Sequence, residues 1–157
     1  MEIYRLAICV VMLITAMWFD FKNRTIPNII PASGIVVAII LEISNPVAEN
    51  IYGALLPLIL TPLFFRGIMG AGDIKLMCTI GALCGVAHIA GVIAYSFISG
   101  GVMALVILIY RKIPFSSFAS LPQRIKSGEI RNQNKFPFSF AIFAGFLTEI
   151  IFPISLL

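Results

Sequence analysis

Apolar residues along the chain fall in long blocks instead of the spaced pattern of soluble helices or strands. The blocks cover about residues 3–19, 29–43, 51–65, 74–87, 89–110 and 137–156. A helix that crosses a bilayer needs roughly 20 mainly apolar residues, so we expect the shorter blocks to extend into flanking polar positions. The pattern predicts an all-α integral membrane protein, a bundle of about six transmembrane helices that forms a single domain over residues 1–157.

The polar breaks between blocks define a topology. Turn residues and a proline at 43–46 (Ile-Ser-Asn-Pro) separate the second block from the third. Residues 74–110 are apolar almost throughout, and we divide them near 85–88 (Gly-Val-Ala-His). With this division, all basic residues except Arg5 fall on one side of the membrane. The positive-inside rule makes that side cytoplasmic and places both termini outside.

Composition agrees with this class of protein. The chain is 60% hydrophobic and 11% charged, whereas soluble domains carry roughly 25% charged residues. The net charge of +4 does not indicate nucleic acid, because the basic residues punctuate apolar blocks. Membrane lipid is the expected environment. The basic stretch 111–136 is predicted as a cytoplasmic loop, which either lies as an amphipathic segment on the inner leaflet or only sets topology.

Several other reactive side chains are expected to be structural. Cys9, Cys78 and Cys84 lie in apolar stretches without a CxxC pair or His/Cys cluster, so neither a metal nor a cofactor is expected. His88 is expected at a turn or interface. Glu149 is an acid within the last block, and we expect it to reach the outer interface.

Two aspartates are the strongest candidates for chemistry. Asp20 ends the first block, and Asp73 opens the fourth within 70–76 (Gly-Ala-Gly-Asp-Ile-Lys-Leu). Acids at membrane segments are costly and usually functional. The topology places both on the cytoplasmic face, where packing could bring them together. Two close carboxylates share a proton, and such a pair can activate water to cleave a peptide bond.

Each aspartate also has a structural interpretation. Asp73 would serve as the N-cap of the fourth helix after a glycine turn. Asp20 would be an interfacial acid whose charge is offset by Lys22 and Arg24. Helix-terminus electrostatics favour Asp73 as the ionised base and Asp20 as the protonated acid, but Lys22 and Arg24 oppose this, and the assignment stays open.

Three segments carry a resemblance to a known family. Residues 70–76 resemble the GxGDxK[LM] signature of type IV prepilin peptidases, the membrane aspartic proteases of the GxGD class. Asp20 with residues 24–28 (Arg-Thr-Ile-Pro-Asn) resembles that family's first-aspartate region. Residues 137–141 (Pro-Phe-Ser-Phe-Ala) resemble the block that opens the final span, with Ser139 where glycine is common. The resemblance covers essentially the whole chain.

The resemblance implies a function and a site. Asp20 and Asp73 would be the catalytic pair of an aspartic endopeptidase. Its substrates would be prepilins or pseudopilins, whose short basic leader it removes at the cytoplasmic face of the inner membrane. Residues that would support the motif or bind substrate are Gly70, Gly72, Lys75, Pro27, Asn28 and Pro137. The two glycines would let the substrate backbone approach Asp73, or would serve only packing or turn geometry.

The connection after the first apolar block is short, and this limits the activities that the resemblance implies. Larger, bifunctional relatives also N-methylate the mature pilin and carry a further cytoplasmic region with paired cysteines. Here a loop of about nine residues follows the first block. The chain is therefore similar to short peptidase-only forms, such as Tad/Flp-pilus prepilin peptidases or archaeal preflagellin-type enzymes, and no methyltransferase activity is expected.

Two other classes of function remain as alternatives. A small transporter or proton-relay subunit would use membrane acids, but it is expected to place them near mid-bilayer and to show repeated halves. Here the acids flank basic loops at one face, and no repeat is apparent. A non-catalytic pilus-assembly subunit would keep the fold, although the intact aspartate pair argues against it. The sequence does not indicate an oligomeric state.

Overall fold

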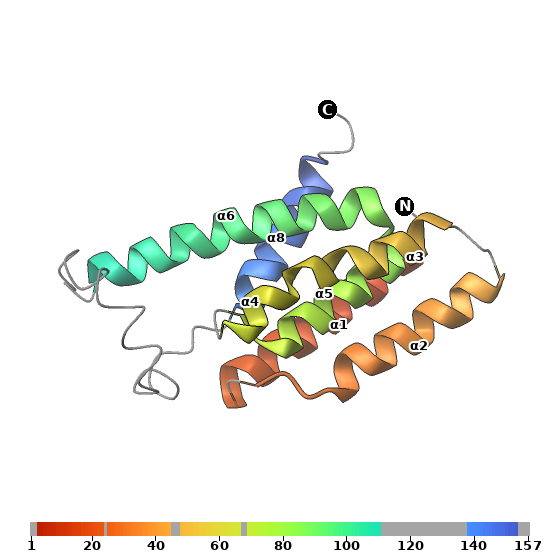
Figure 1. Ribbon diagram of the computed structural model, residues 1–157, viewed down its shortest axis with the longest axis horizontal. Helices are drawn as coiled ribbons and strands as arrows, with labels where there is room; N and C mark the ends of the chain where they lie inside the picture. Colours follow the sequence, from red (N-terminus) through yellow and green to blue (C-terminus); the bar gives the residue numbers. More distant parts are fainter. Residues whose placement is uncertain (1–2, 24, 45–47, 67–68, 111–137, 154–157) are drawn as a thin grey trace.

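The computed structural model describes residues 3–23, 25–44, 48–66, 69–110 and 138–153, and every regular element in these ranges is helical. The elements are α1 (Ile3–Asn23), α2 (Ile29–Ser44), α3 (Ala48–Leu55), the 3₁₀ helix η1 (Leu56–Leu60), α4 (Thr61–Phe65), α5 (Ala71–Cys84), α6 (Val86–Tyr110) and α8 (Ser139–Ile151), as Figure 1 shows. Because α3, η1 and α4 follow one another without a gap, they form one continuous apolar helix, Ala48–Phe65. The prediction of an all-α bundle of about six helices is confirmed. The loop predicted at 111–136 lies outside the described residues.

The outside of the bundle is apolar. Three helices are long and apolar enough to cross a membrane, namely Ile3–Asn23, Ala48–Phe65 and Val86–Val106, and two shorter apolar helices accompany them. Large side chains such as Trp18 and Ile43 point outward. A soluble protein rarely exposes so much contiguous apolar surface, whereas lipid solvates it readily. The chain is a membrane protein.

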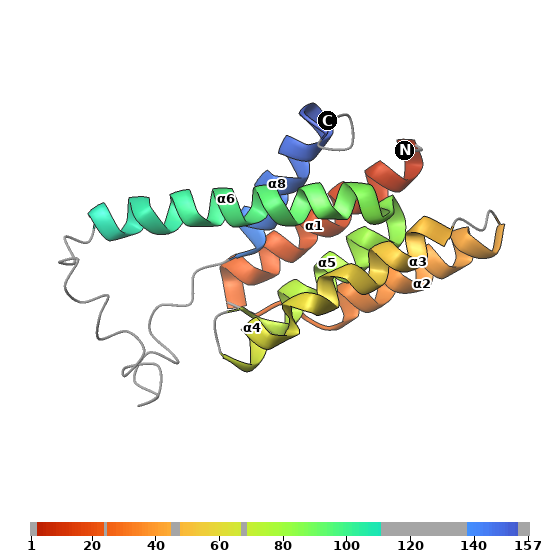
Figure 2. The same ribbon diagram turned by 45° about the horizontal axis from the view of Figure 1, so that its top comes forward.

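Helix α5 occupies the centre of the bundle. It packs against α1, α2, α3, η1 and α6, while α8 packs against α6 and also contacts α1. Figures 1 and 2 show α8 crossing α6 at a steep angle, beside the end of α1. Gly81 of α5 and Gly53 of α3 bring two backbones into contact, since a Cβ on Gly81 would lie 2.0 Å from the Gly53 carbonyl oxygen. Small residues of this kind are typical of helix contacts in membranes.

Gly85 separates α5 from α6. Its φ of +85° lies in the left-handed region that side chains other than glycine rarely adopt. Its N–H donates to the Gly81 carbonyl at 2.9 Å, which ends α5, and α6 begins at the next residue. The division predicted near 85–88 is thus confirmed, and α5 and α6 are separate helices of the bundle.

A polar network joins four segments at one end of the bundle. The Arg5 guanidinium of α1 donates to the Leu83 carbonyl of α5 at 3.3 Å and lies 3.8 Å from the Glu42 carboxylate of α2. Asn50 of α3 donates to the same carboxylate at 2.7 Å. Since Arg5 starts α1 and Leu83 ends α5, the two helices are antiparallel. The end of α1 therefore lies at the start of α5.

A fully buried acid lies at the same end as Arg5. Glu149 of α8 is only 1% exposed and packs against Gly91 of α6. One of its oxygens lies 3.5 Å from His88 Nδ1, in the first turn of α6. The expectation that Glu149 reaches the outer interface is wrong, because the tight α6–α8 contact encloses its side chain. His88 lies in the first turn of α6, beside this carboxyl group.

Candidate active site

Asp20 belongs to the buried face of α1. The residues of this face recur at helical spacing, and they are Cys9, Met12, Leu13, Ala16 and Asp20. Side chains three or four positions apart share one face of a helix, so the acid continues an apolar stripe into the core. Asp20 is accordingly only 7% exposed. An acid with only a surface role would not lie on this buried face.

Asp73 is the third residue of α5 and is 8% exposed. Gly70 is the N-cap, so the interpretation of Asp73 itself as the N-cap is wrong by position. The Gly70 N–H donates to Asp73 Oδ2 at 3.3 Å, which is the contact an acid at this position makes back to the helix start. The other oxygen, Oδ1, is buried and has no hydrogen-bond partner in the described part of the chain. Helix capping therefore accounts for the position of Oδ2 but not for the burial of Oδ1.

The two aspartates come together at one end of the bundle. Antiparallel packing places the last turns of α1 beside the first turn of α5, and the Asp20 carboxylate is close enough to interact electrostatically with Asp73. Two carboxyl groups this near to each other can act together, one taking a proton while the other gives one. This is the arrangement that acid–base hydrolysis requires.

Ser139 is a third member of the site. It is the first residue of α8, is fully buried, and donates its hydroxyl proton to Asp20 Oδ2 at an Oγ–Oδ2 distance of 2.6 Å. In the sequence this position stood out only as a departure from a glycine in the final block. The signal that could have indicated it is a hydroxyl side chain inside the block that resembles the start of the family's final span.

The segment before α2 packs against the start of α5. Lys75 Nζ donates to Asn28 Oδ1 at 3.1 Å, on the exposed side of the site. A Cβ on Gly72 would lie 3.0 Å from the Cβ of Ile26, so Gly72 permits a close approach of this segment. Pro27 accepts the Ile30 N–H at 3.1 Å and thereby begins α2. These residues fix the loop next to Asp73.

The two glycines therefore have internal packing roles. Gly72 faces Ile26, and a Cβ on Gly70 would lie 2.9 Å from Asp73 Oδ2. These contacts favour the packing interpretation over direct approach of a substrate backbone. Pro137, the remaining predicted site residue, lies outside the described residues.

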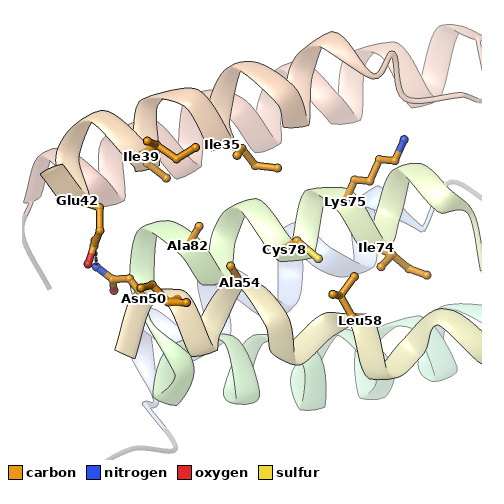
Figure 3. A pocket seen from close by; sticks show the side chains of 12 residues that line it. Ile35, Ile39, Glu42, Asn50, Ala54, Leu58, Ile74, Lys75, Cys78 and Ala82 are labelled. Atoms are coloured by element: carbon orange, nitrogen blue, oxygen red, sulfur yellow. Dashed lines mark hydrogen bonds between the residues drawn. The ribbon is translucent and has the colours of Figure 1, made fainter. Parts of the chain in front are cut away.

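An apolar groove of about 420 Å³ opens beside the site, between α2, the α3–η1 helix and α5 (Figure 3). Ile74 and Lys75, which directly follow Asp73, line it at one end. Glu42 and Asn50 lie at the far end, joined by their hydrogen bond. Its remaining lining is apolar and includes Ile35, Ile39, Ala54, Leu58 and Cys78. The groove is thus an apolar surface that ends at the two residues after Asp73.

A buried pair of carboxyl groups at one end of an all-α membrane bundle makes this a candidate acid–base site. Comparison of the sequence with models of protein families shows which family the chain belongs to. The sequence model of the type IV leader peptidase family matches residues 7–105, a stretch that includes both aspartates. Since this match covers more than half of the chain, the protein belongs to the type IV leader peptidase family and is a peptidase of that kind. Searches of curated proteins and of solved structures gave no match.

Proposed function

We propose that this protein is an aspartic endopeptidase that removes the short basic leader from type IV prepilin-like proteins. One observation carries the proposal: Asp20 and Asp73, from different helices, are both buried and close enough to interact. Membership of the leader peptidase family supports a peptidase acting on leader sequences. In the described residues, the histidine lies with Glu149 at the other end of the bundle, where it does not activate a nucleophile at this site.

The pair would hydrolyse the peptide bond in two steps. The ionised aspartate takes a proton from water as the water oxygen attacks the carbonyl carbon, and the protonated aspartate gives its proton to the carbonyl oxygen. The resulting diol returns a proton to the second aspartate as the C–N bond breaks. The leaving nitrogen takes the proton held by the first aspartate. Both groups end in their starting states, so the site needs no metal or cofactor in this scheme.

The proposed location is the inner membrane, with cleavage at the cytoplasmic face. Lys22 and Lys75 flank the aspartate end of the bundle and are exposed, while the acidic residues Glu42, Glu49 and Glu149 lie toward the other end. Basic residues are retained on the cytoplasmic side of a membrane protein. This orientation supports both termini outside and presents the site to a leader that has not crossed the membrane.

A peptidase-only enzyme fits the connection between the first two helices. The segment from Asn23 at the end of α1 to Ile29 at the start of α2 is short and packs against α5. No inserted cytoplasmic region stands between these two helices in the sequence. We therefore propose leader cleavage without N-methylation.

Co-expression with a prepilin from the same organism tests the proposal, with pilin mass as the readout. The variants Asp20→Asn and Asp73→Asn remove one acid each and keep its shape. Glu149→Gln is a matched control, because it neutralises an equally buried acid at the opposite end. Loss of cleavage in both aspartate variants, with normal membrane insertion and an active control, supports the pair. Cleavage that persists in either variant refutes the two-aspartate mechanism.

A further inference from the structure

The hydrogen bond between Ser139 and Asp20 distinguishes the two aspartates. Asp20 Oδ2 accepts a hydroxyl proton over 2.6 Å from a fully buried side chain. Asp73 accepts only a backbone N–H over 3.3 Å, and its Oδ1 has no partner in the described part of the molecule. Donors aimed at a carboxyl oxygen stabilise the ionised form, whereas a buried oxygen without a donor does not.

The start of α8 strengthens this difference. Considered on its own helix, Asp20 lies near the unfavourable C-terminal end of α1. The bundle, however, brings the first residue of α8 against its carboxylate, and the N-terminus of a helix is its positive end. Asp73 lies in the first turn of α5 and has the same kind of support from its own helix. The side-chain hydroxyl of Ser139 is therefore what sets Asp20 apart.

Two other serines of this bundle, the buried Ser96 and the partly buried Ser99, behave differently. Ser96 donates to the Val92 carbonyl at 2.6 Å, within its own helix α6. Ser99 donates to the Ala141 carbonyl at 3.0 Å. Both satisfy a hydroxyl with backbone, the usual partner of a helical serine. Ser139 is aimed instead at a carboxylate on another helix, which indicates a role at the site beyond satisfying its own hydroxyl.

We propose that Ser139 is a positioning residue that holds Asp20 as the ionised base and thereby leaves Asp73 as the protonated partner. The proposal rests on the proposed function and reverses the assignment that helix ends alone favour. In the first step of hydrolysis, Asp20 would take the proton of water through Oδ1 while Ser139 holds Oδ2. Asp73 would then donate its proton to the carbonyl oxygen of the scissile bond.

Kinetics of the purified protein in lipid vesicles test this role, with a prepilin as substrate. Ser139→Ala removes the hydroxyl and little else. We expect kcat to fall about tenfold with KM within about twofold, because a hydrogen bond to a charged group is lost at the reacting carboxylate only. Ser96→Ala is the matched control, since it removes an equally buried hydroxyl from the α6–α8 contact and should leave kcat unchanged.

Thermal unfolding provides a second readout that needs no activity. Ser139→Ala should lower the melting temperature in the wild-type and Asp73→Asn backgrounds, and should lower it much less in the Asp20→Asn background. An equal decrease in all three backgrounds overturns the proposal, as does wild-type kcat in Ser139→Ala beside an active parent. A parent that cleaves no prepilin overturns the proposed function instead, and the thermal comparison then decides whether Ser139 and Asp20 are coupled.

Discussion

The main-chain N–H of Gly70 donates to Oδ2 of Asp73 at 3.3 Å, and a Cβ on Gly70 would lie 2.9 Å from that same oxygen. The absence of a side chain at position 70 thus leaves room for the carboxyl group. The backbone of Gly70 is extended, with φ of −74° and ψ of 143°, so alanine can adopt its conformation. A substitution here would displace the carboxyl group without straining the chain.

We therefore expect Gly70→Ala to lower leader cleavage by about 10- to 100-fold, since a displacement of about 1 Å at a reacting group has effects of this size. The protein should still fold. Gly101→Ala is the control, because its added Cβ would meet no atom within 4 Å beyond its chain neighbours and its own helix backbone. Cleavage rates of the two purified variants check this prediction, and equal rates would contradict it.

The contact between Gly81 and Gly53 predicts a loss of stability instead of a loss of chemistry. Alanine at 81 would place its Cβ 2.0 Å from the Gly53 carbonyl oxygen, and neither backbone can move without separating α3 from α5. Overpacking of this kind costs about 1–3 kcal/mol or more. The melting temperature of Gly81→Ala in detergent should fall well below that of Gly101→Ala. A variant that melts with the wild type would show that these helices are not in contact.

The helices and their order could be predicted from local pattern, whereas the assembled site could not. Apolar blocks indicate helices because every backbone group must be bonded within its own segment in lipid. Asp20 also continues the spacing of Cys9, Met12 and Ala16, so its inward direction was readable from the sequence. The contact of Asp20 with Ser139 joins residues from the first and last helices, and its existence depends on packing that no local pattern encodes.

The dependence on packing also explains why the prediction for Glu149 was wrong. The Phe152-Pro153 pair that follows soon after it suggested an interface, but the small residue Gly91 lets α6 approach α8 and enclose the carboxylate. Whether an acid near a helix end is buried depends on which residue faces it. A glycine on the facing helix removes the space through which a side chain would reach water.

The polar network of Arg5, Glu42 and Asn50 lies at the end of the bundle opposite the aspartates. A substitution there should lower stability and leave activity unchanged. Glu42→Ala removes the partner of Arg5 and the acceptor of Asn50 together. Removing one member of a buried ion pair costs about 3–5 kcal/mol, and the partial exposure of Glu42 reduces this to about 1–3 kcal/mol. We expect a lower melting temperature with cleavage per folded molecule close to wild type, because the network lies at the end opposite Asp20. A specific loss of kcat at full stability would contradict this division.

The apolar groove beside Asp73 predicts an effect on substrate binding. If the membrane-embedded part of a prepilin lies along it, filling the groove should raise KM and leave kcat nearly unchanged, since the aspartates are not disturbed.

Ala54→Trp fills the groove, as its side chain lines the cavity between α2 and α5 (Figure 3). Val36→Trp is the matched control, because Val36 lies on α2 with 57% of its surface exposed and does not line the groove. We expect KM for Ala54→Trp to rise about tenfold above that of Val36→Trp, as the loss of burial for one large apolar side chain would produce. Equal KM values in the two variants would show that the substrate approaches the aspartates by another route.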